Sequence, residues 1–225
     1  MAFEQKHGPK KIDLCIGTYG SSSWDEKVNQ QLRRLFAGIK VDVDFNFSPP
    51  KRAELELFSG LCDAYFAGPE LLIKQVSGQN FFLIRPHLLI VHLNLYSYKA
   101  NNSITKSLES IDKRDIRIGY FTSLQLKSFM EQTIRRASLQ ELTNVDQGFE
   151  MLERKRIDYF IFPEVENSPG FTRKNDKNLQ CTTLATIPLY LLMDESYIHL
   201  KGTIETNIDS MSKTEAWVQV FQTRK

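Results

Sequence analysis

The sequence predicts an α/β protein with two lobes, each built on a mostly parallel sheet flanked by helices. Three observations carry this prediction. Short apolar strand patterns alternate with helical patterns nearly throughout the chain, as in parallel sheets covered by helices. The composition turns polar and turn-like over 99–106, and a second α/β cycle follows. Extended apolar segments at 88–98 and 182–191 connect the two cycles, so the chain would cross between the lobes twice.

The first cycle opens with an apolar strand at 12–17 and an amphipathic helix over 28–36 that stops at Gly38. In the next strand, at 41–47, Asp42 and Asp44 alternate with apolar residues, which predicts one solvated face. The remaining expected elements of this cycle are a helix near 55–58 closed by Gly60, a strand at 61–67, a brief helix at 71–73, and extended segments at 81–84 and 88–98.

The second cycle repeats the alternation. Its helices are expected at 107–111, 126–134 and 146–153, and its strands at 116–121, 138–142 and 157–162. An extended segment at 179–193, interrupted at Pro188, leads to two final helices at 197–211 and 214–221. Two crossings between two α/β lobes are what a hinge requires, and a ligand would lie at the carboxyl ends of strands, in the cleft between the lobes.

Bulk composition excludes several classes of partner. The chain has 225 residues and a formal net charge of +2 from 29 basic and 27 acidic residues, which gives no reason to expect nucleic acid or an anionic membrane. No apolar run approaches the roughly 18 residues needed to span a bilayer. Residues 1–11 are polar and lack the apolar core of a secretory signal, so the chain is either cytoplasmic or a mature form.

The three cysteines, Cys15, Cys62 and Cys181, are scattered singly. An odd number without CxxC spacing argues against a disulfide framework and against a zinc site. Cys15 and Cys62 each lie in an apolar strand pattern, where a buried inert thiol is the ordinary interpretation. The alternative is a Cys15–Cys62 bridge, since the two strands could be neighbours.

Enzyme motifs are absent from the sequence. It contains no GxSxG, P-loop, GxGxxG or HExxH pattern, and no cofactor or metal is expected. We therefore predict a protein that is not an enzyme. An enzyme on this fold would need a titratable residue facing the ligand, for which Glu70 and Glu164 are the candidates.

Candidate ligand contacts in the first lobe follow the strand ends. Tyr19, Ser22 and Trp24 come after the first strand, where aromatic rings and hydroxyls could hold a planar or polar solute. The alternative is a helix cap with Trp24 packed on the surface. Gly68 and Glu70 follow another strand, although an exposed glutamate that starts a helix is the commoner case.

Candidates in the second lobe also follow strands. Thr122 and Ser123 precede a helix whose unpaired amides could hold an anionic or carbonyl group, and an N-cap role explains them equally well. Glu164 lies at the end of the 157–162 strand and is the best candidate for a polar anchor. His87 and His92 fall on opposite faces of a strand, which argues against a shared metal.

Four segments, in order, resemble the family 3 extracellular solute-binding proteins, which have the type II periplasmic-binding-protein fold and serve polar amino acids. They are PKRAELELFSGLCDAYFAG at 50–68, SLESIDKRDIRIGYFTS at 107–123, GFEMLERKRIDYFIFPEVE at 148–166 and IPLYLLMDES at 187–196. The resemblance extends from about Lys11 to Gln222. It implies that lobe one contains residues 1–95 and 189–225, and that lobe two is the insertion 96–188, joined by two hinge crossings.

The resemblance also exposes departures at the ligand site. Amino-acid binders of this family hold the ligand carboxylate with an arginine at the position that Gln75 occupies here, and glutamine cannot supply that charge. The carboxylate that meets the ligand ammonium falls on Pro163, with Glu164 next to it. The usual glycine–threonine pair at the lobe-two helix reads Thr122-Ser123.

The sequence thus predicts a non-enzymatic solute-binding protein that closes on a small polar molecule, amino-acid-like or other, for ABC-type uptake or sensing. Its partners would be the ligand and an ABC transporter permease or a sensor protein. Family habit places it in the periplasm, with cytoplasmic location as the alternative. The alternative function is a regulatory or interaction domain of the same fold that has lost small-molecule binding.

Overall fold

The computed structural model describes residues 11–18, 22–73, 80–98, 107–165 and 177–212. The chain divides into two compact units: unit 1 contains Met1–Leu89 and Pro188–Lys225, and unit 2 contains Ile90–Ile187. Both crossings fall within strands, β4 (Phe81–Tyr98) and β8 (Leu179–Asp194). The sequence had suggested boundaries at 95/96 and 188/189.

Unit 1 has the strand order β2-β1-β3-β8. Strand β1 (Lys11–Gly17) pairs in parallel with β2 (Asp42–Ser48) and with β3 (Ala64–Pro69), and β8 runs antiparallel to β3. The other elements of this unit are α1 (Ser22–Leu35), α2 (Pro50–Phe58), α3 (Glu70–Ile73), the 3-10 helix η2 (Glu195–Leu200) and α7 (Lys201–Ser212).

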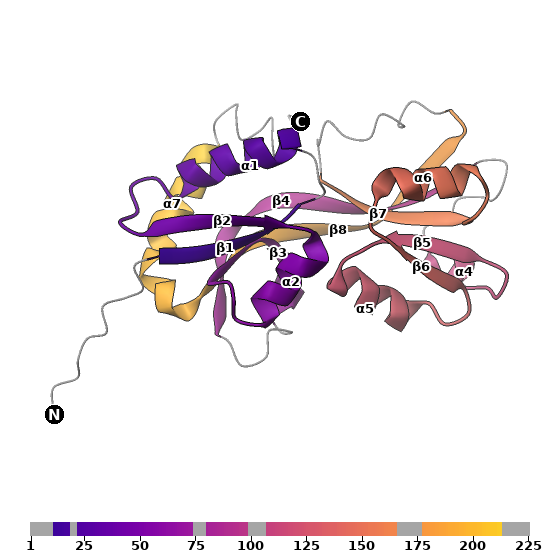
Figure 1. The fold of residues 1–225 in the computed structure, drawn as a ribbon, viewed down its shortest axis with the longest axis horizontal. Helices are drawn as coiled ribbons and strands as arrows, with labels where there is room; N and C mark the ends of the chain where they lie inside the picture. The colour runs from indigo at the N-terminus through magenta and orange to yellow at the C-terminus, as the bar shows by residue number, and fades with distance from the viewer. Residues whose placement is uncertain (1–10, 19–21, 74–79, 99–106, 166–176, 213–225) are drawn as a thin grey trace. The chain divides into compact units, whose positions relative to one another are not determined.

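Helices cover both faces of the unit 1 sheet, and Figure 1 shows α1 and α2 on opposite sides of β1. Side chains alternate along a strand, so Cys15 points to the face opposite Leu14 and Ile16. Cys15 packs with Ala53 and Leu57 of α2, and all of these residues are buried. At the other end of the chain, Asn207 of α7 donates from Nδ2 to the carbonyl of Leu35 at 2.8 Å and fastens the C-terminal helix to the end of α1.

Glycine ends both long helices of unit 1 that the sequence predicted. Gly38 and Gly60 have φ of 78° and 70°, a left-handed conformation that costs glycine little because it has no Cβ. After Gly60 the amide of Leu61 donates to the carbonyl of Glu56 at 2.9 Å and closes the last turn of α2. The predicted stops at these glycines are confirmed.

Cys15 and Cys62 form a disulfide in unit 1, with their Cα atoms 5.8 Å apart. The interpretation as two inert thiols is therefore wrong, and the bridge that the sequence left open is present. The physical reason is strand pairing, because Cys15 lies opposite Tyr65 of β3 and Cys62 lies two residues before that strand begins. Cys181 is exposed and lies outside this disulfide.

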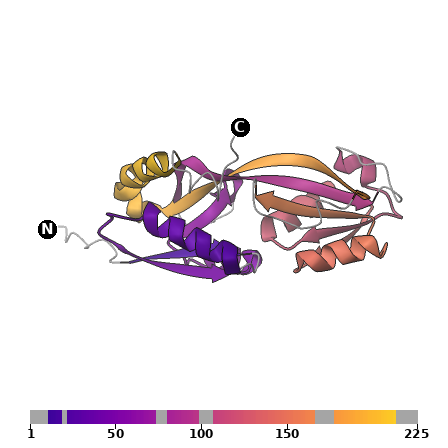
Figure 2. The ribbon, with the colours of Figure 1, turned by 90° about the horizontal axis from the view of Figure 1, so that it is seen from above.

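Unit 2 has the strand order β4-β7-β5-β6. Strand β5 (Arg117–Phe121) pairs in parallel with β6 (Ser138–Leu142) and β7 (Tyr159–Val165), and β4 runs antiparallel to β7. The helices are α4 (Leu108–Ile111), α5 (Leu124–Thr133) and α6 (Val145–Glu153). Figure 2 shows α4 and α6 on opposite sides of these strands.

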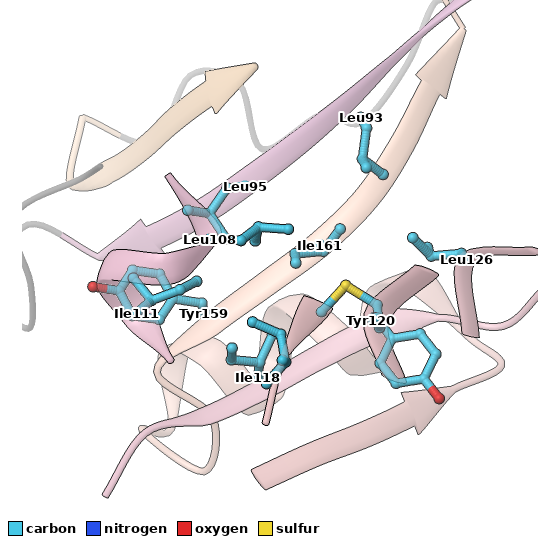
Figure 3. Close-up of a cluster of buried hydrophobic side chains, with 11 residues drawn as sticks. Leu93, Leu95, Leu108, Ile111, Ile118, Tyr120, Leu126, Tyr159 and Ile161 are labelled. Atoms are coloured by element: carbon cyan, nitrogen blue, oxygen red, sulfur yellow. The ribbon is translucent and has the colours of Figure 1, made fainter. Parts of the chain in front are cut away.

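Each face of the unit 2 sheet has its own hydrophobic core. On the face of α4 and α5, Leu95, Ile118 and Ile161 of three strands point toward Leu108 and the other labelled side chains of Figure 3. The face of α6 is aromatic: Phe149 lies with its ring centroid 5.1 Å from Tyr96 and 5.2 Å from Phe160, both edge-to-face. Edge-to-face pairs at such distances add to the stabilisation from buried area.

Several element boundaries differ from those expected. The two predicted extended segments at 81–84 and 88–98 form the single strand β4, which continues through a cis Arg85–Pro86 peptide. The predicted helix at 197–211 is two elements, η2 and α7. The predicted helix at 214–221 lies outside the described residues.

Asp42 and Asp44 are exposed on β2, as the alternation predicted. Among the described residues, no helix is long and apolar enough to cross a membrane.

Gly148 gives a test of the unit 2 core. A Cβ at this position would lie 2.6 Å and 2.7 Å from two ring carbons of Phe160, which is closer than real contacts allow. Gly148→Ala should therefore destabilise the protein by about 1–3 kcal/mol, even though alanine favours helix by about 1 kcal/mol. The measurement is the free energy of unfolding in urea. Gly202→Ala in α7 is the matched control, because nothing lies within 4 Å of its Cβ position and the change should be neutral or stabilising.

The disulfide gives a second prediction. It closes a segment with a sequence separation of 47, for which chain entropy predicts up to about 4 kcal/mol of stabilisation. Cys62→Ser should lower the free energy of unfolding by roughly 2–4 kcal/mol. Thiol titration of the native, unreduced protein should find one reactive thiol, that of Cys181. Cys181→Ser is the control and should abolish that signal without a loss of stability; three reactive thiols would contradict the pairing.

Candidate ligand-binding site

The carboxyl ends of three parallel strands bring polar residues together in unit 2. Phe121 lies opposite Leu142 in the β5–β6 pairing, and Tyr120 lies opposite Ile161 in the β5–β7 pairing. Thr122, which directly follows β5, and Glu164, near the end of β7, therefore lie toward the same end of the sheet. In parallel α/β sheets this end is where ligands bind.

Thr122 forms hydrogen bonds within unit 2. It is buried, its amide donates to the carbonyl of Leu142 at 2.8 Å, and its Oγ1 donates to Oε1 of Glu141 on β6. Glu141 is half-buried. Burial, followed by the charges of Glu141 and Glu131, raises the pKa of the neighbouring Tyr120 to about 12. This end of unit 2 therefore carries a hydroxyl and a carboxylate side by side.

Ser123 is the N-cap of α5. Its backbone is extended, and its Oγ accepts a hydrogen bond from the amide of Leu126 at 3.0 Å. Such a cap satisfies one of the unpaired donors at a helix start. The cap role that the sequence offered as an alternative is therefore present, and contact with a ligand stays a prediction for both Thr122 and Ser123.

Glu164 is buried in a polar network. Its Oε2 accepts hydrogen bonds from Nδ2 of Asn94 and from the hydroxyl of Tyr96, both at 2.7 Å. Oδ1 of Asn94 in turn accepts from the hydroxyl of Thr183 on β8 at 2.9 Å. Burial and the hydrogen bond to Glu164 raise the pKa of Tyr96 well above its usual range. The network joins β4, β7 and β8, which gives Glu164 a structural role within unit 2.

Strand ends in unit 1 also carry polar groups. The amide of Thr18, after β1, donates to the carbonyl of Ser48 at the end of β2 at 2.9 Å. Gly68 on β3 is buried, and a Cβ there would lie 2.6 Å from Leu192 and 2.9 Å from Leu72, so those leucine side chains would have to shift to admit a larger residue. Glu70 begins α3 and is exposed, with its Oε1 at 3.4 Å from Nη2 of Arg85.

Other predicted contacts are not described by the structure. Tyr19 and Gln75 lie outside the described residues. Ser22 and Trp24 belong to α1, but their side chains are outside what the structure describes. Their roles in ligand binding stay predictions.

Sequence reasoning missed Glu141, Asn94 and Tyr96 as members of these polar groups. A signal for Asn94 was available, because an amide within an apolar strand must find buried partners. Glu141 gave no such signal, because its neighbour Thr122 is 19 residues away in sequence and only the β5–β6 register brings the two together.

No protein-family model matches this chain, and no curated protein matches it in sequence. Solved structures match nearly all of it. An ancestral amino-acid-binding protein, a precursor of cyclohexadienyl dehydratase, is 12% identical with a TM-score of 0.68, covering 94% of this chain and 93% of its own. The GluR0 ligand-binding core in complex with L-glutamate is also 12% identical, with a TM-score of 0.67 and coverage of 94% and 96%.

A third similar structure is an amino acid ABC transporter substrate-binding protein from Streptococcus pneumoniae bound to L-arginine. It is 13% identical, with a TM-score of 0.65 and coverage of 95% of this chain and 93% of that one. At such identities the likeness shows the fold, which is the two-lobed periplasmic-binding-protein fold with α/β lobes. The fold class predicted from the sequence is confirmed.

The Glu164 network can be tested by a double-mutant cycle. Tyr96→Phe and Glu164→Gln should each destabilise the protein by about 1–3 kcal/mol, because each leaves a buried polar group with a lost partner. The coupling between them should be roughly 0.5–3 kcal/mol, measured by urea unfolding. Additive effects would contradict a shared network.

The Tyr96→Phe variant also tests how the free energy of unfolding depends on pH. The raised pKa of Tyr96 means that the folded state holds the phenolic proton more tightly than the unfolded state does. This contribution to stability is full below the ordinary tyrosine value of 10.0 and is lost as the pH rises above it. Tyr96→Phe should therefore make the free energy of unfolding fall less steeply above pH 10.

Proposed function

We propose that this chain is a non-enzymatic solute-binding domain of the family 3 type that binds a small polar molecule, amino-acid-like or other. The observation that carries the proposal is the likeness of the fold, over more than nine-tenths of the chain, to structures whose printed descriptions are of amino-acid-binding proteins. The four sequence segments that resemble this family support it independently, because they occur in the family's order.

The strand ends supply the candidate contacts. In unit 2 the hydroxyl of Thr122 and the carboxylate of Glu141 lie at the carboxyl ends of β5 and β6. In unit 1 the candidates from the sequence are Tyr19, Ser22, Trp24, Gly68, Glu70 and Gln75. Hydroxyls and carboxylates of this kind bind ammonium and hydroxyl groups, whereas the missing arginine at Gln75 leaves a free ligand carboxylate without its usual partner.

The partners would be the small molecule and an ABC transporter permease or a sensor protein. The Cys15–Cys62 disulfide supports an oxidising compartment, since such bonds persist in the periplasm and outside cells but are rare in the cytosol. We therefore favour the periplasm.

A second candidate is a regulatory or interaction domain that keeps the fold without a small-molecule ligand. The observation that favours it is that two residues predicted to contact the ligand already form hydrogen bonds within the protein. Glu164 accepts from Asn94 and Tyr96, and Thr122 donates to Glu141, so neither side chain offers all of its hydrogen-bonding capacity to a solute.

A thermal-shift screen against amino acids, amines, nucleosides, sugars and small organic acids separates the two functions. A ligand at a hundred times its Kd should stabilise the folded state by about 2.7 kcal/mol, which raises the melting temperature by roughly 5–10 °C for a chain of this size. A concentration-dependent rise with one class supports solute binding. No rise with any class would refute it and favour the second candidate.

Matched variants then place the site. Thr122→Val should weaken the binding of the ligand found in the screen about tenfold or more, because a hydroxyl that binds a polar ligand contributes about 1.5 kcal/mol or more. Each melting temperature is compared with that of the same variant without ligand, so a loss of intrinsic stability does not enter. Thr133→Val in α5 is the control and should bind like the unaltered protein; equal affinity in Thr122→Val would exclude this strand end from the site.

A further inference from the structure

Three metal-ligating side chains of unit 1 converge beneath α2. The Sγ atoms of Cys15 and Cys62 and a carboxylate oxygen of Glu56 all lie within 4.8 Å of one another. Both cysteines are buried, at 2% and 4% exposure, while the side chain of Glu56 is 22% exposed. None of these residues belongs to the strand-end groups described above.

The distances suit a small metal ion once the sulfurs are separate. Tetrahedral zinc with Zn–S of about 2.3 Å and Zn–O of about 2.0 Å places neighbouring sulfur and oxygen ligands roughly 3.5 Å apart. Sγ of Cys15 lies 3.7 Å from Oε2 of Glu56. Reduction of the disulfide lets the two sulfurs separate to about 3.8 Å, which is the spacing of neighbouring thiolates on tetrahedral zinc.

A strand and a helix hold two of the three side chains, and backbone hydrogen bonds beside Cys62 hold the third. Cys15 is within β1, and Glu56 is on α2, which packs on that strand. Cys62 is followed by Asp63, whose amide donates to the carbonyl of Asp13 at 2.9 Å and whose Oδ2 accepts from the amide of Asp13 at 2.9 Å. The ligands therefore stay near one another when the bridge opens.

The carboxylate of Glu56 is oriented by two further side chains. Arg52 donates from Nε to Oε1 at 2.8 Å, and Ser48, which is buried, donates from Oγ to Oε2 at 3.3 Å. Outer hydrogen bonds of this kind fix ligating carboxylates in metal sites. They direct Oε2 toward the sulfur atoms.

A divalent cation would also balance the charges of the separated ligands. In the oxidised protein the sulfurs of the disulfide carry no proton, so they cannot donate a hydrogen bond to the carboxylate of Glu56. Two thiolates and Glu56 together carry three negative charges, and Arg52 supplies one positive charge. A divalent ion neutralises the rest, and thiolate ligands favour zinc over magnesium or calcium.

We propose that reduction of the Cys15–Cys62 disulfide creates a zinc site formed by these two thiolates and the carboxylate of Glu56. A dithiol reductant is oxidised to its own disulfide as it passes two electrons and two protons to the bridge, giving two thiols. Zinc binding then releases both thiol protons. Water completes the tetrahedron through the exposed side of Glu56. The oxidised protein has lost both sulfur ligands and binds no metal here.

Cobalt(II) is the probe, because thiolate–cobalt bonds give a charge-transfer absorption that other ligands do not. The protein carrying Cys181→Ser is titrated with Co²⁺ without oxygen, before and after reduction, and the reductant is removed first. Reduced protein should bind one Co²⁺ per chain with the charge-transfer band, and Zn²⁺ should displace it. Oxidised protein should show no band.

Two variants test the ligand set in the reduced state. Glu56→Gln should weaken Co²⁺ binding roughly 100-fold and Ser48→Ala about tenfold, in line with losses at other metal sites. Glu150→Gln is the matched control, because it removes a carboxylate that is also paired with an arginine on a helix, and it should bind like the parent. Circular dichroism of each reduced variant verifies the fold.

The proposal is overturned if the reduced, folded protein shows no charge-transfer band, or if Glu56→Gln binds Co²⁺ as tightly as its parent. The proposal is also overturned if the reduced parent protein loses its circular dichroism signal and binds Co²⁺ no more tightly than the Glu56→Gln variant does. The site does not depend on the proposed solute binding, so failure of the thermal-shift screen leaves this experiment decisive.

Discussion

The hydrogen bonding of β4 and β8 is the constraint on which the rest of the structure depends, because each strand serves both units. β8 pairs with β3 in unit 1 through Leu189–Met193, while its earlier residues belong to unit 2. β4 pairs with β7 in unit 2, and its first residues belong to unit 1. Backbone pairing must be satisfied along the whole of a buried strand. Each unit therefore completes its parallel sheet with an antiparallel strand that the other unit also uses.

This constraint explains why polar groups are buried in unit 2. Where β4, β7 and β8 run together, the buried Asn94, Tyr96 and Glu164 form a hydrogen-bonded network, which the exposed Thr183 extends. At the surface, Nδ1 of His92 lies 3.1 Å from Oγ1 of Thr186. Such networks are costly when incomplete and specify one register when complete. A slip of β4 by one residue would turn Asn94, Tyr96 and His92 to the opposite face and separate them from their partners on β7 and β8.

Parallel pairing has a second consequence, which concerns where polar side chains gather. The parallel strands of each unit end on the same edge of their sheet. These strands are β1, β2 and β3 in unit 1, and β5, β6 and β7 in unit 2. Thr122 with Glu141, and Ser48 with the amide of Thr18, lie at those edges. The fold thus places hydroxyl and carboxylate groups at these edges. The Cys15–Cys62–Glu56 cluster lies under α2, and Ser48 connects it to the unit 1 edge by donating to Oε2 of Glu56.

The sequence by itself determined the α/β class, the two cycles and most helix ends, because hydrophobic periodicity and glycine stops such as Gly38 and Gly60 are local signals. It also offered a cap role for Ser123 as one of two interpretations, and the structure shows that cap. Only the tertiary structure decided that Cys15 joins Cys62, that Thr122 donates to Glu141 and that Glu164 is buried under Asn94 and Tyr96. Each of these contacts joins residues 19 to 70 positions apart. Strand register brings them together, and register is set by packing across the whole sheet rather than by any local pattern.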